Sequence, residues 1–396
     1  MGLGAAGLLI THGVGCSKDQ KQEGAADRAK DAPSSPVAIE RCESYEPQVV
    51  RAKLDAALDS IGGIKKLVNG KTVTIKINVT GGPGDMVGLP GYRTYHTHPV
   101  VLAAMCAALH DAGAKRIVIV ESQYSPKTPE EVLGGTGWDI NAIKSAGGNT
   151  VSFADTRNRG SFPAYSTLRV PWGGFLFPAF MVNQQYEKTD VFVSLGKMKD
   201  HICGGITLSI KNLFGIAPTS LYGGDAPNEN TTDYRGPILH NGARAVPAGV
   251  PAEKEVVKEW KKRVPRITAD LAGIRPVDLA VVDAIETTHG GEGPWIKKVG
   301  AIQPKLLLAG RNAVCTDAIG ACTMGYDPQA EHYAFPFPGE NYLRLLASVG
   351  VGTIDPKKIE VRGLSIEKAL IQFNPNKEPL ETPTAYLRHR LNSALV

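Results

Sequence analysis

The chain lacks several features that mark common classes of protein. Its six cysteines include no C-x-x-C pair, so the sequence supports neither an iron–sulfur cluster nor a structural zinc site. No basic run with interleaved aromatic residues occurs, and the formal charge of +5 is spread along the chain, which argues against a nucleic-acid partner. There is no internal repeat, and the apolar run near the N-terminus is, at about 15 residues, too short to cross a bilayer.

What remains is the composition of an ordinary globular protein. The 396 residues are 42% hydrophobic and 21% charged, which is enough chain for a large core. The slight positive balance suits a small anionic ligand, and no feature identifies a protein partner. Cys106, Cys315 and Cys322 fall in helical patterns, so buried thiols are expected there.

The N-terminal segment is typical of an exported protein. Residues 1–15 are small and apolar and Cys16 follows them, which resembles an export signal that ends in a lipoprotein-type cysteine. The start, MGLGAAGLL, also resembles the part of a bacterial twin-arginine signal that follows the paired arginines. Residues 17–40 are polar and predict a flexible tether. We therefore expect a periplasmic protein, or one anchored through Cys16 on the outer side of the cytoplasmic membrane; an N-terminal core helix is the alternative.

Alternating helices and strands predict the fold. Strand patterns occur at 71–79, 115–122 and 150–154, and helical patterns occur at 46–67, 99–113 and 138–146. This βαβαβ order predicts an α/β fold with a mostly parallel sheet and helices on both faces. We expect it to occupy residues 41–396 as a single domain, with two lobes at about 41–200 and 201–396 as the alternative.

The rest of the chain is less regular. An irregular insertion at 160–186 predicts a hairpin around Trp172, and the polar segment 222–247 is long enough to be a lid. That segment contains Tyr234, Arg235 and His240. Beyond it, the patterns predict strands and helices at 252–263, 266–273, 277–285, 305–310, 312–324 and 339–349.

The stretch from 187 to 218 carries the strongest functional signal. A strand with a buried pattern runs into a polar cluster made of Lys197, Lys199, Asp200 and His201. Gly204 and Gly205 follow, and then a predicted amphipathic helix over 206–214 that carries Lys211. Glycines before a helix leave its first amides open to a ligand, and these amides favour an anion.

Polar groups follow several predicted strands, and ligands of open α/β sheets bind at the carboxyl ends of strands. We therefore expect His201 and Lys211 to border one pocket together with at least one of His98, Glu121 and Asp283. His201 would do acid/base work, because the ordinary pKa of histidine lies near neutrality. The alternative is a loop histidine and a solvated lysine without a shared role.

The order of these segments resembles domain-of-unknown-function family 362. The resemblance covers about 70–363 and is carried by KINV, THPVVLAAMCAALHDAGAKRIVIVES and TDVFVSLGKMKDHICGGITLSIKNLFGIAP, among other pieces. The most specific pattern is K-x-K-x-H followed by T-x-x-x-K-N-x-x-G. The resemblance implies a fold and a shared site, but no particular activity.

A remoter resemblance is to the N-terminal domain of nickel-pincer lactate racemase. That family has H-x-x-A-G-F-S-G-G-x-K where this chain runs from His201 to Lys211 with the same ten-residue spacing. There the lysine holds the pincer cofactor and the histidine transfers a proton. The resemblance implies that Lys211 binds a cofactor or anion and that His201 is an acid/base. Glu121 stands near the place of the racemase's second histidine, where an acidic residue would substitute.

These observations give one set of candidates. The predicted catalytic residues are His201, Glu121 and Asp283. The predicted ligand- or cofactor-binding residues are Lys211, Lys197, Lys199, Gly204, Gly205, Asn212, Thr97 and His98. No metal ligand is predicted, and the cofactor is not identified.

The expected function is an exported protein with a pocket for a small anion or cofactor. The pocket would serve acid/base chemistry on a hydroxy- or carboxylic-acid substrate. Two alternatives remain open. One is a non-catalytic extracytoplasmic protein that binds a small ligand or metal, and the other is an accessory protein of an exported redox enzyme.

Overall fold

The computed structural model describes residues 32–81, 84–160, 163–374, 376–378 and 380. The expected export segment with Cys16 and most of the expected tether lie outside these residues. The prediction of a tether was wrong at its end, because Val37–Arg41 form strand β1 and Val37, Ala38 and Ile39 are fully buried. Among the described residues, no helix combines the length and apolar character needed to cross a membrane.

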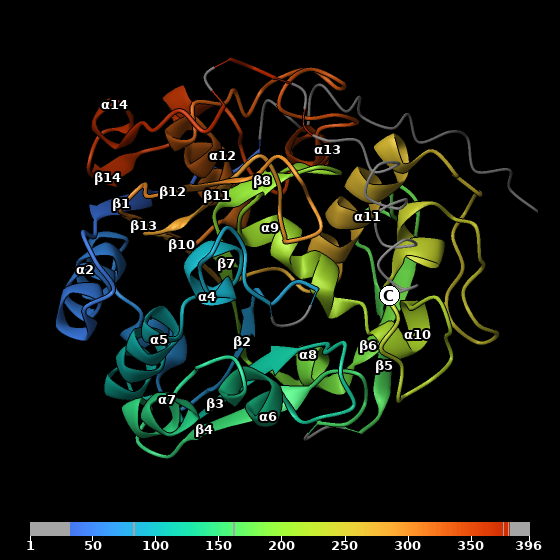
Figure 1. The fold of residues 1–396 in the computed structure, drawn as a ribbon, viewed down its shortest axis with the longest axis horizontal. Helices are drawn as coiled ribbons and strands as arrows, with labels where there is room; N and C mark the ends of the chain where they lie inside the picture. The colour runs from blue at the N-terminus through green and yellow to red at the C-terminus, as the bar shows by residue number, and fades with distance from the viewer. Residues whose placement is uncertain (1–31, 82–83, 161–162, 375, 379, 381–396) are drawn as a thin grey trace, which may run out of the picture.

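A mixed eight-stranded sheet organises the molecule (Figure 1). Its strands, in spatial order, are β14 (Val361–Gly363), β1 (Val37–Arg41), β13 (Leu306–Gly310), β10 (Leu279–Ala284), β7 (Val191–Lys197), β2 (Thr72–Ile77), β3 (Arg116–Glu121) and β4 (Val151–Asp155). The run from β10 to β4 is parallel, and β13 is antiparallel to both of its neighbours. The predicted α/β class is thus confirmed, and strands from both sides of residue 200 join the same sheet.

Helices cover both faces of the sheet (Figure 1). One face packs against α2 (Pro47–Ser60), α5 (Pro99–Asp111) and α7 (Ile140–Ala146), and the other against α9 (Ser209–Asn212), α11 (Trp260–Ile274), α12 (Ala313–Thr323) and α13 (Tyr342–Ser348). Strand side chains alternate between the two cores. Val191 and Val193 of β7 belong to the core of α2 and α5, whereas Phe192 belongs to the core of α11. This period of two decides which core a strand-end residue reaches.

The remaining elements are short. The helical ones are α3 (Lys65–Val68), α4 (Gly91–Thr94), α6 (Pro129–Gly134), α8 (Gln184–Lys188), α10 (Thr219–Tyr222), α14 (Ile366–Ala369), a π-turn at Gly236–His240, and 3-10 turns at Leu213–Ile216 and Pro356–Lys358. Three strand pairs stand apart from the main sheet: β5 (Tyr165–Arg169) with β6 (Ala179–Asn183), β8 (Lys199–His201) with β9 (Gly205–Thr207), and β11 (Thr287–His289) with β12 (Gly300–Ile302). The first pair is the hairpin expected around Trp172.

Three predicted helices have different bounds. Residues 205–207 pair with 199–201 as strands, which leaves α9 as a single turn instead of a helix over 206–214. The predicted helix over 46–67 is interrupted at Gly62 and Gly63, whose φ angles are 97° and 70°, in the left-handed region that glycine tolerates. Residues 252–259 lie before α11, and α11 runs unbroken through Pro265. The Lys261 carbonyl, which Pro265 cannot bond, accepts the amide of Glu340 at 2.8 Å instead.

Candidate functional site

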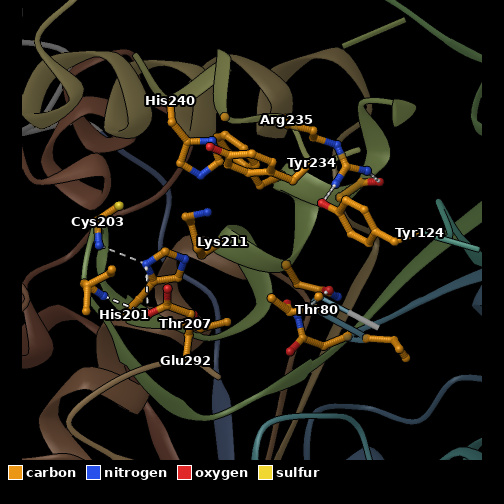
Figure 2. A pocket seen from close by; sticks show the side chains of 18 of the residues that line it. Thr80, Tyr124, His201, Cys203, Thr207, Lys211, Tyr234, Arg235, His240 and Glu292 are labelled. Atoms are coloured by element: carbon orange, nitrogen blue, oxygen red, sulfur yellow. Dashed lines mark hydrogen bonds and ion pairs between the residues drawn. The ribbon is translucent and has the colours of Figure 1, made fainter. Parts of the chain in front are cut away.

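A cavity of about 140 Å³ lies beyond the carboxyl ends of β2 and β3 (Figure 2). Strand-end residues, α9 and the segment that follows α10 enclose it. Four predicted site residues line this cavity: Glu121, His201, Lys211 and Asn212. The structure therefore places His201 and Lys211 together with Glu121, at the edge where ligands of open α/β sheets bind.

A buried ion pair forms one side of the cavity. Lys76 Nζ lies 2.8 Å from Glu121 Oε2, and the two side chains are 1% and 5% exposed. The Glu121 carboxylate also accepts the amides of Val79 at 3.1 Å and Ser122 at 3.0 Å. Burial lowers the pKa of Lys76 despite this pairing. Glu121 is thus engaged by a lysine and two backbone amides.

The Asn212 side chain forms hydrogen bonds both to this ion pair and to the end of β2. Its Oδ1 accepts hydrogen bonds from Lys76 Nζ at 3.3 Å and from Asn78 Nδ2 at 3.1 Å, and its Nδ2 donates to the Lys76 carbonyl at 3.1 Å. Lys199 Nζ donates to Asn78 Oδ1 at 2.7 Å and to the Tyr95 carbonyl. Lys199 is fully buried, and burial holds its pKa well below the ordinary value. It does not line the cavity, so its place is behind Asn78.

His201 is oriented by its own turn. Its Nδ1 accepts the Cys203 amide at 3.0 Å, so the neutral ring carries its proton on Nε2. Burial, followed by the charges of Lys211 and Lys199, holds the pKa of His201 well below its ordinary value. The expectation of a near-neutral pKa was therefore wrong, because burial and neighbouring cations keep the imidazole neutral. A neutral ring with Nε2–H is a hydrogen-bond donor at neutral pH.

Glu292 lies beside His201 in the same wall (Figure 2). Its Oε2 is 3.7 Å from His201 Nδ1 and accepts the Ile202 amide at 2.9 Å, while Oε1 accepts Trp295 Nε1 at 3.3 Å. Burial raises the pKa of Glu292. This carboxyl therefore anchors the turn that carries His201.

Two cations at the cavity have no carboxylate partner within the described part of the chain. Lys211 is 6% exposed, and its Nζ lies 3.9 Å from the centre of the Phe214 ring. Burial lowers the pKa of Lys211 to about 8. Arg235 is 4% exposed. It donates to neutral oxygens only: Ala217 O at 2.5 Å, Tyr124 Oη at 2.6 Å and Gly215 O at 3.2 Å.

The cavity is therefore electropositive. Burial is the main cause that lowers the pKa values of Lys76 and Lys211. Neighbouring acidic groups raise these values, and the Arg235 charge lowers them again, as like charges held close together do. Two carboxyl groups line the cavity among the described residues: Glu121, which pairs with Lys76, and Glu292, whose pKa burial raises and whose charge attracts Lys211 from beyond ion-pair distance. An anion in the cavity would relieve the remaining repulsion, and low solvent exposure would strengthen its attraction to Lys211 and Arg235.

The remaining walls are largely aromatic. Phe214, Tyr234, Trp260 and Trp295 line the cavity together with His240. Burial, followed by the Lys211 charge, lowers the pKa of His240 to about 3. Thr207 is 2% exposed, and its Oγ1 has no hydrogen-bond partner among the described residues. A ligand therefore meets aromatic surfaces, a few polar groups and two unpaired cations.

The 222–247 segment, the candidate lid, forms a wall of this cavity. It supplies Tyr234, Arg235 and His240. Arginines from other elements hold its backbone, because Arg157 Nη1 donates to the Thr231 carbonyl at 2.7 Å and Arg263 Nε donates to the Ile238 carbonyl at 2.9 Å. The segment is thus fastened over the site by buried guanidinium groups.

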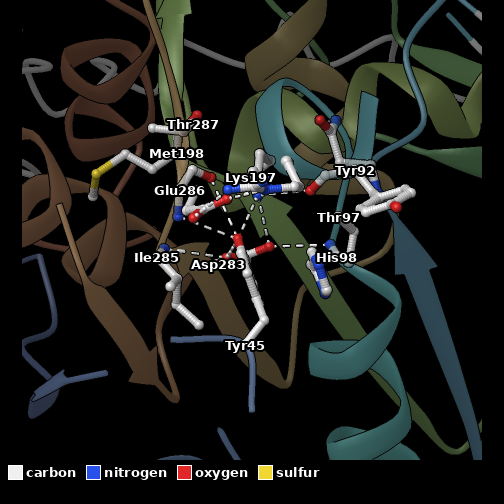
Figure 3. Close-up of polar contacts among 12 residues, drawn as sticks. Tyr45, Tyr92, Thr97, His98, Lys197, Met198, Asp283, Ile285, Glu286 and Thr287 are labelled. Atoms are coloured by element: carbon white, nitrogen blue, oxygen red, sulfur yellow. Dashed lines mark hydrogen bonds and ion pairs between the residues drawn. The ribbon is translucent and has the colours of Figure 1, made fainter. Parts of the chain in front are cut away.

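Three other predicted residues gather in a separate cluster (Figure 3). Lys197 Nζ lies 2.9 Å from Asp283 Oδ2, the Tyr45 hydroxyl donates to Asp283 Oδ1 at 2.9 Å, and the His98 amide donates to Oδ2 at 3.0 Å. None of these residues lines the cavity. Lys197 and Asp283 continue the alternation that places Val193 and Val281 in the core of α2 and α5. The carboxyl-edge rule gives the correct end of the sheet, but it does not give the face.

The neighbouring helix start is structural as well. His98 Nδ1 accepts the Val100 amide at 3.2 Å and caps α5. Thr97 Oγ1 accepts the Asn78 amide at 2.9 Å and donates to the Leu195 carbonyl at 3.0 Å. Neither residue lines the cavity, so the structure does not place them where a ligand contact was predicted.

The predicted glycine-loop anion site was wrong. Gly204 and Gly205 do not line the cavity, and Gly205 is the first residue of β9, which lies between Gly204 and α9. The first amides of α9, those of Ser209 and Ile210, donate to the Asp317 carboxylate at 2.9 and 2.8 Å. Burial raises the pKa of Asp317 to about 7. The helix start is therefore already occupied by an internal carboxyl group.

Sequence reasoning did not assign Arg235, His240, Glu292 or Thr207 to the site. Arg235 and His240 stood in the long polar segment, whose length was their only signal. Glu292 followed a predicted strand in a glycine-rich turn. Within the described residues, no group of three or more His, Cys, Asp or Glu side chains is arranged to hold a metal ion.

Comparisons with known proteins place this chain in a family. The family described as domain of unknown function (DUF362) matches residues 73–322, which include every cavity residue named above. A thylakoid-associated protein of Synechocystis sp. is 27% identical over 190 residues, which is 46% of this chain and 50% of that protein. The chain thus spans about half the length of that relative. A crystal structure of a Thermotoga maritima protein aligns with 63% of this chain and 52% of its own, at 13% identity and a TM-score of 0.33.

Proposed function

This chain belongs to the family described as domain of unknown function (DUF362), and we propose that its cavity binds a compact organic anion. One observation carries the proposal: Lys211 and Arg235 both line a buried cavity and have no carboxylate partner in the described part of the chain. Burying a cation without a counter-charge is costly. A bound carboxylate would supply that counter-charge.

The size of the cavity limits the ligand. Its volume is about 140 Å³, close to that of an engineered apolar cavity of about 150 Å³ that binds benzene. A short oxo or hydroxy acid, or a single aromatic ring with a carboxylate, is of this size. The aromatic walls suit the apolar part of such a ligand.

The polar residues of the cavity suit the carboxylate and the hydroxy or oxo group of such a ligand. Arg235 has five N–H donors and uses three of them on neutral oxygens, so two remain for a carboxylate. His201 Nε2–H and Thr207 Oγ1–H suit a second oxygen on the ligand. Lys211, whose pKa burial lowers to about 8, is the group best matched to accept or return a proton near neutral pH. We therefore propose acid/base chemistry on a hydroxy or oxo acid.

Binding can be tested with a thermal-shift panel of 2-hydroxy acids, 2-oxo acids, aromatic carboxylates and inorganic phosphate. A carboxylate that fits should stabilise wild type, and a concentration of 100 times its Kd would add about 2.7 kcal/mol of unfolding free energy. Arg235→Met should weaken that ligand about ten- to a hundred-fold, because a charge-assisted bond contributes about 1.5–3 kcal/mol. The exposed Lys66→Met is the matched control. A ligand that stabilises all three proteins equally would place its site elsewhere.

Catalysis needs a separate measurement. Proton–deuterium exchange at C2 of a 2-hydroxy acid, or at C3 of a 2-oxo acid, followed by NMR in D2O, would report proton transfer on the best-stabilising acid. We expect proton–deuterium exchange with wild type and little exchange with Lys211→Met or His201→Asn. If His201→Asn weakens binding and no protein shows exchange, the cavity serves as a non-catalytic binding site.

A further inference from the structure

The amine of Lys211 lies at the cavity without a hydrogen-bond or ion-pair partner among the described residues. Its Nζ contacts the face of Phe214 at 3.9 Å. A lysine ammonium has three donors, and burying them without acceptors disfavours the charged form. The neutral amine avoids that penalty, and Lys211 lines the cavity.

The packing of α9 and the lack of a side chain at Gly204 fix the position of this amine. Lys211 belongs to α9, whose first amides are bound by Asp317, and α9 packs against β7. A Cβ at Gly204 would lie 3.3 Å from Lys211 Cε and 3.4 Å from its Cδ. The absence of a side chain at this position leaves room for the lysine stem, and Figure 2 shows the amine between His201 and His240.

The surroundings of the amine raise the fraction of its reactive, neutral form. Burial is the main cause that lowers the pKa of Lys211 to about 8, and the Arg235 charge adds to it. At pH 7 roughly a tenth of Lys211 is then neutral, which is roughly two hundred times the fraction for a lysine with the ordinary pKa. A lysine desolvated next to another cation is the usual arrangement for attack on a carbonyl carbon.

We propose that Lys211 condenses with the carbonyl group of a compact 2-oxo acid to form an imine. This inference rests on the proposed function, because Arg235 would hold the carboxylate of the same ligand. The amine attacks the carbonyl carbon, the carbonyl oxygen takes up a proton, and the resulting carbinolamine loses water. The nitrogen gives up two protons, the oxygen leaves as water, and no oxidant or reductant is involved. Neutral His201 donates through Nε2–H to the carbonyl oxygen as it gains charge.

Reductive trapping tests the proposal. The full chain is incubated with pyruvate or phenylglyoxylate and sodium cyanoborohydride, and the adduct is located by intact-mass and peptide mass spectrometry. We expect one adduct per chain, on Lys211, with labelling that rises steeply between pH 6 and pH 8. Lys66→Met should label as wild type does. Lys211→Arg and Lys211→Met should both lose the adduct, and the second variant covers the case in which arginine does not fit.

Three outcomes separate this inference from the anion proposal. Acetone, which lacks the carboxylate, should label Lys211 at least tenfold less than pyruvate, and Arg235→Met should remove that preference. Stabilisation by 2-oxo acids without an adduct on Lys211 would overturn the imine and leave the anion site standing. Labelling of Lys211 at the same rate as surface lysines, without stabilisation, would overturn both.

Discussion

This protein buries neutral histidines, so acid should destabilise it. His98, which does not line the cavity, is a suitable residue for testing this effect. His98 is 7% exposed, and its ring stacks on that of Tyr45, with ring centroids 3.5 Å apart and planes 7° apart. Its Nδ1 accepts the Val100 amide and caps α5. Burial, followed by the charges of Lys197 and Arg93, lowers the pKa of His98 to about 2.

The sign and size of the effect follow from linkage. The unfolded chain binds a proton at His98 below its ordinary pKa of about 6.5, whereas the folded protein does so only near pH 2. Stability is therefore lost as pH falls below about 6.5, by about 1.4 kcal/mol per pH unit and ~2 kcal/mol in total by pH 5. His96, with its pKa lowered by burial to about 3, acts in the same direction.

Two carboxyl groups act in the opposite direction. Burial raises the pKa of Asp200 to about 6 and that of Asp317 to about 7. The folded protein binds protons at these groups before the unfolded chain does, so they favour folding as pH falls toward about 4. The effects of the histidines and of these two carboxyl groups on the pH dependence of the wild-type unfolding free energy therefore partly cancel. The difference in unfolding free energy between wild type and a variant of one histidine, measured at several pH values, gives the contribution of that histidine alone.

His98→Asn is the suitable variant, because asparagine is a good N-cap and does not titrate. It should be less stable than wild type at pH 7, since it loses the stacking on Tyr45. Urea unfolding at pH 7, 6 and 5 should show that this difference in unfolding free energy narrows by ~2 kcal/mol. Only wild type loses stability at this position as the pH falls, because its unfolded chain takes up a proton at His98 that the folded protein does not. A gap that stays constant over this range would refute a buried neutral His98.

The remaining predictions concern other parts of the chain. Lys197→Met should lower the unfolding free energy by about 3–5 kcal/mol in urea, because it leaves Asp283 buried without its partner, whereas Lys66→Met should change little. Gly204→Ala should weaken the best carboxylate ligand several-fold in the thermal-shift assay with little loss of melting temperature, because its Cβ would lie 3.3 Å from Lys211 Cε; equal affinity would show that the stem can move. Cys16→Ser should release the protein from the membrane fraction if the N-terminal segment is a lipoprotein-type signal, and an unchanged distribution would count against that anchor.

The fold class could be predicted because it depends on periodic patterns. Parallel strands and their covering helices repeat along the chain, and Gly113, with a φ of 88°, ends one of them as expected. The strand at 37–41 was missed because five residues next to a polar, proline-containing stretch give little signal. Its burial depends on β13 and β14, which lie some 270 and 320 residues farther along the chain.

The site could be predicted only in part, for a physical reason. His201 and Glu121 follow from the strand-end rule, because it depends on position along a strand. Lys211 lies in α9 and was predicted from the unit that it forms with His201, ten residues earlier. Arg235 comes from an irregular segment, and only the tertiary fold brings it to the cavity. Asp283 was misplaced because a carboxylate with a buried lysine partner and one at an open site look alike in sequence.

We propose that an organic anion occupies the cavity between Lys211 and Arg235. A crystal structure of the protein soaked with the most stabilising carboxylate tests it most directly. We expect density for the ligand inside the cavity, with carboxylate oxygens within hydrogen-bond distance of Arg235 and the far end against Phe214 and Trp260. A cavity that contains only water, in crystals where the same ligand is bound elsewhere or not at all, would contradict it.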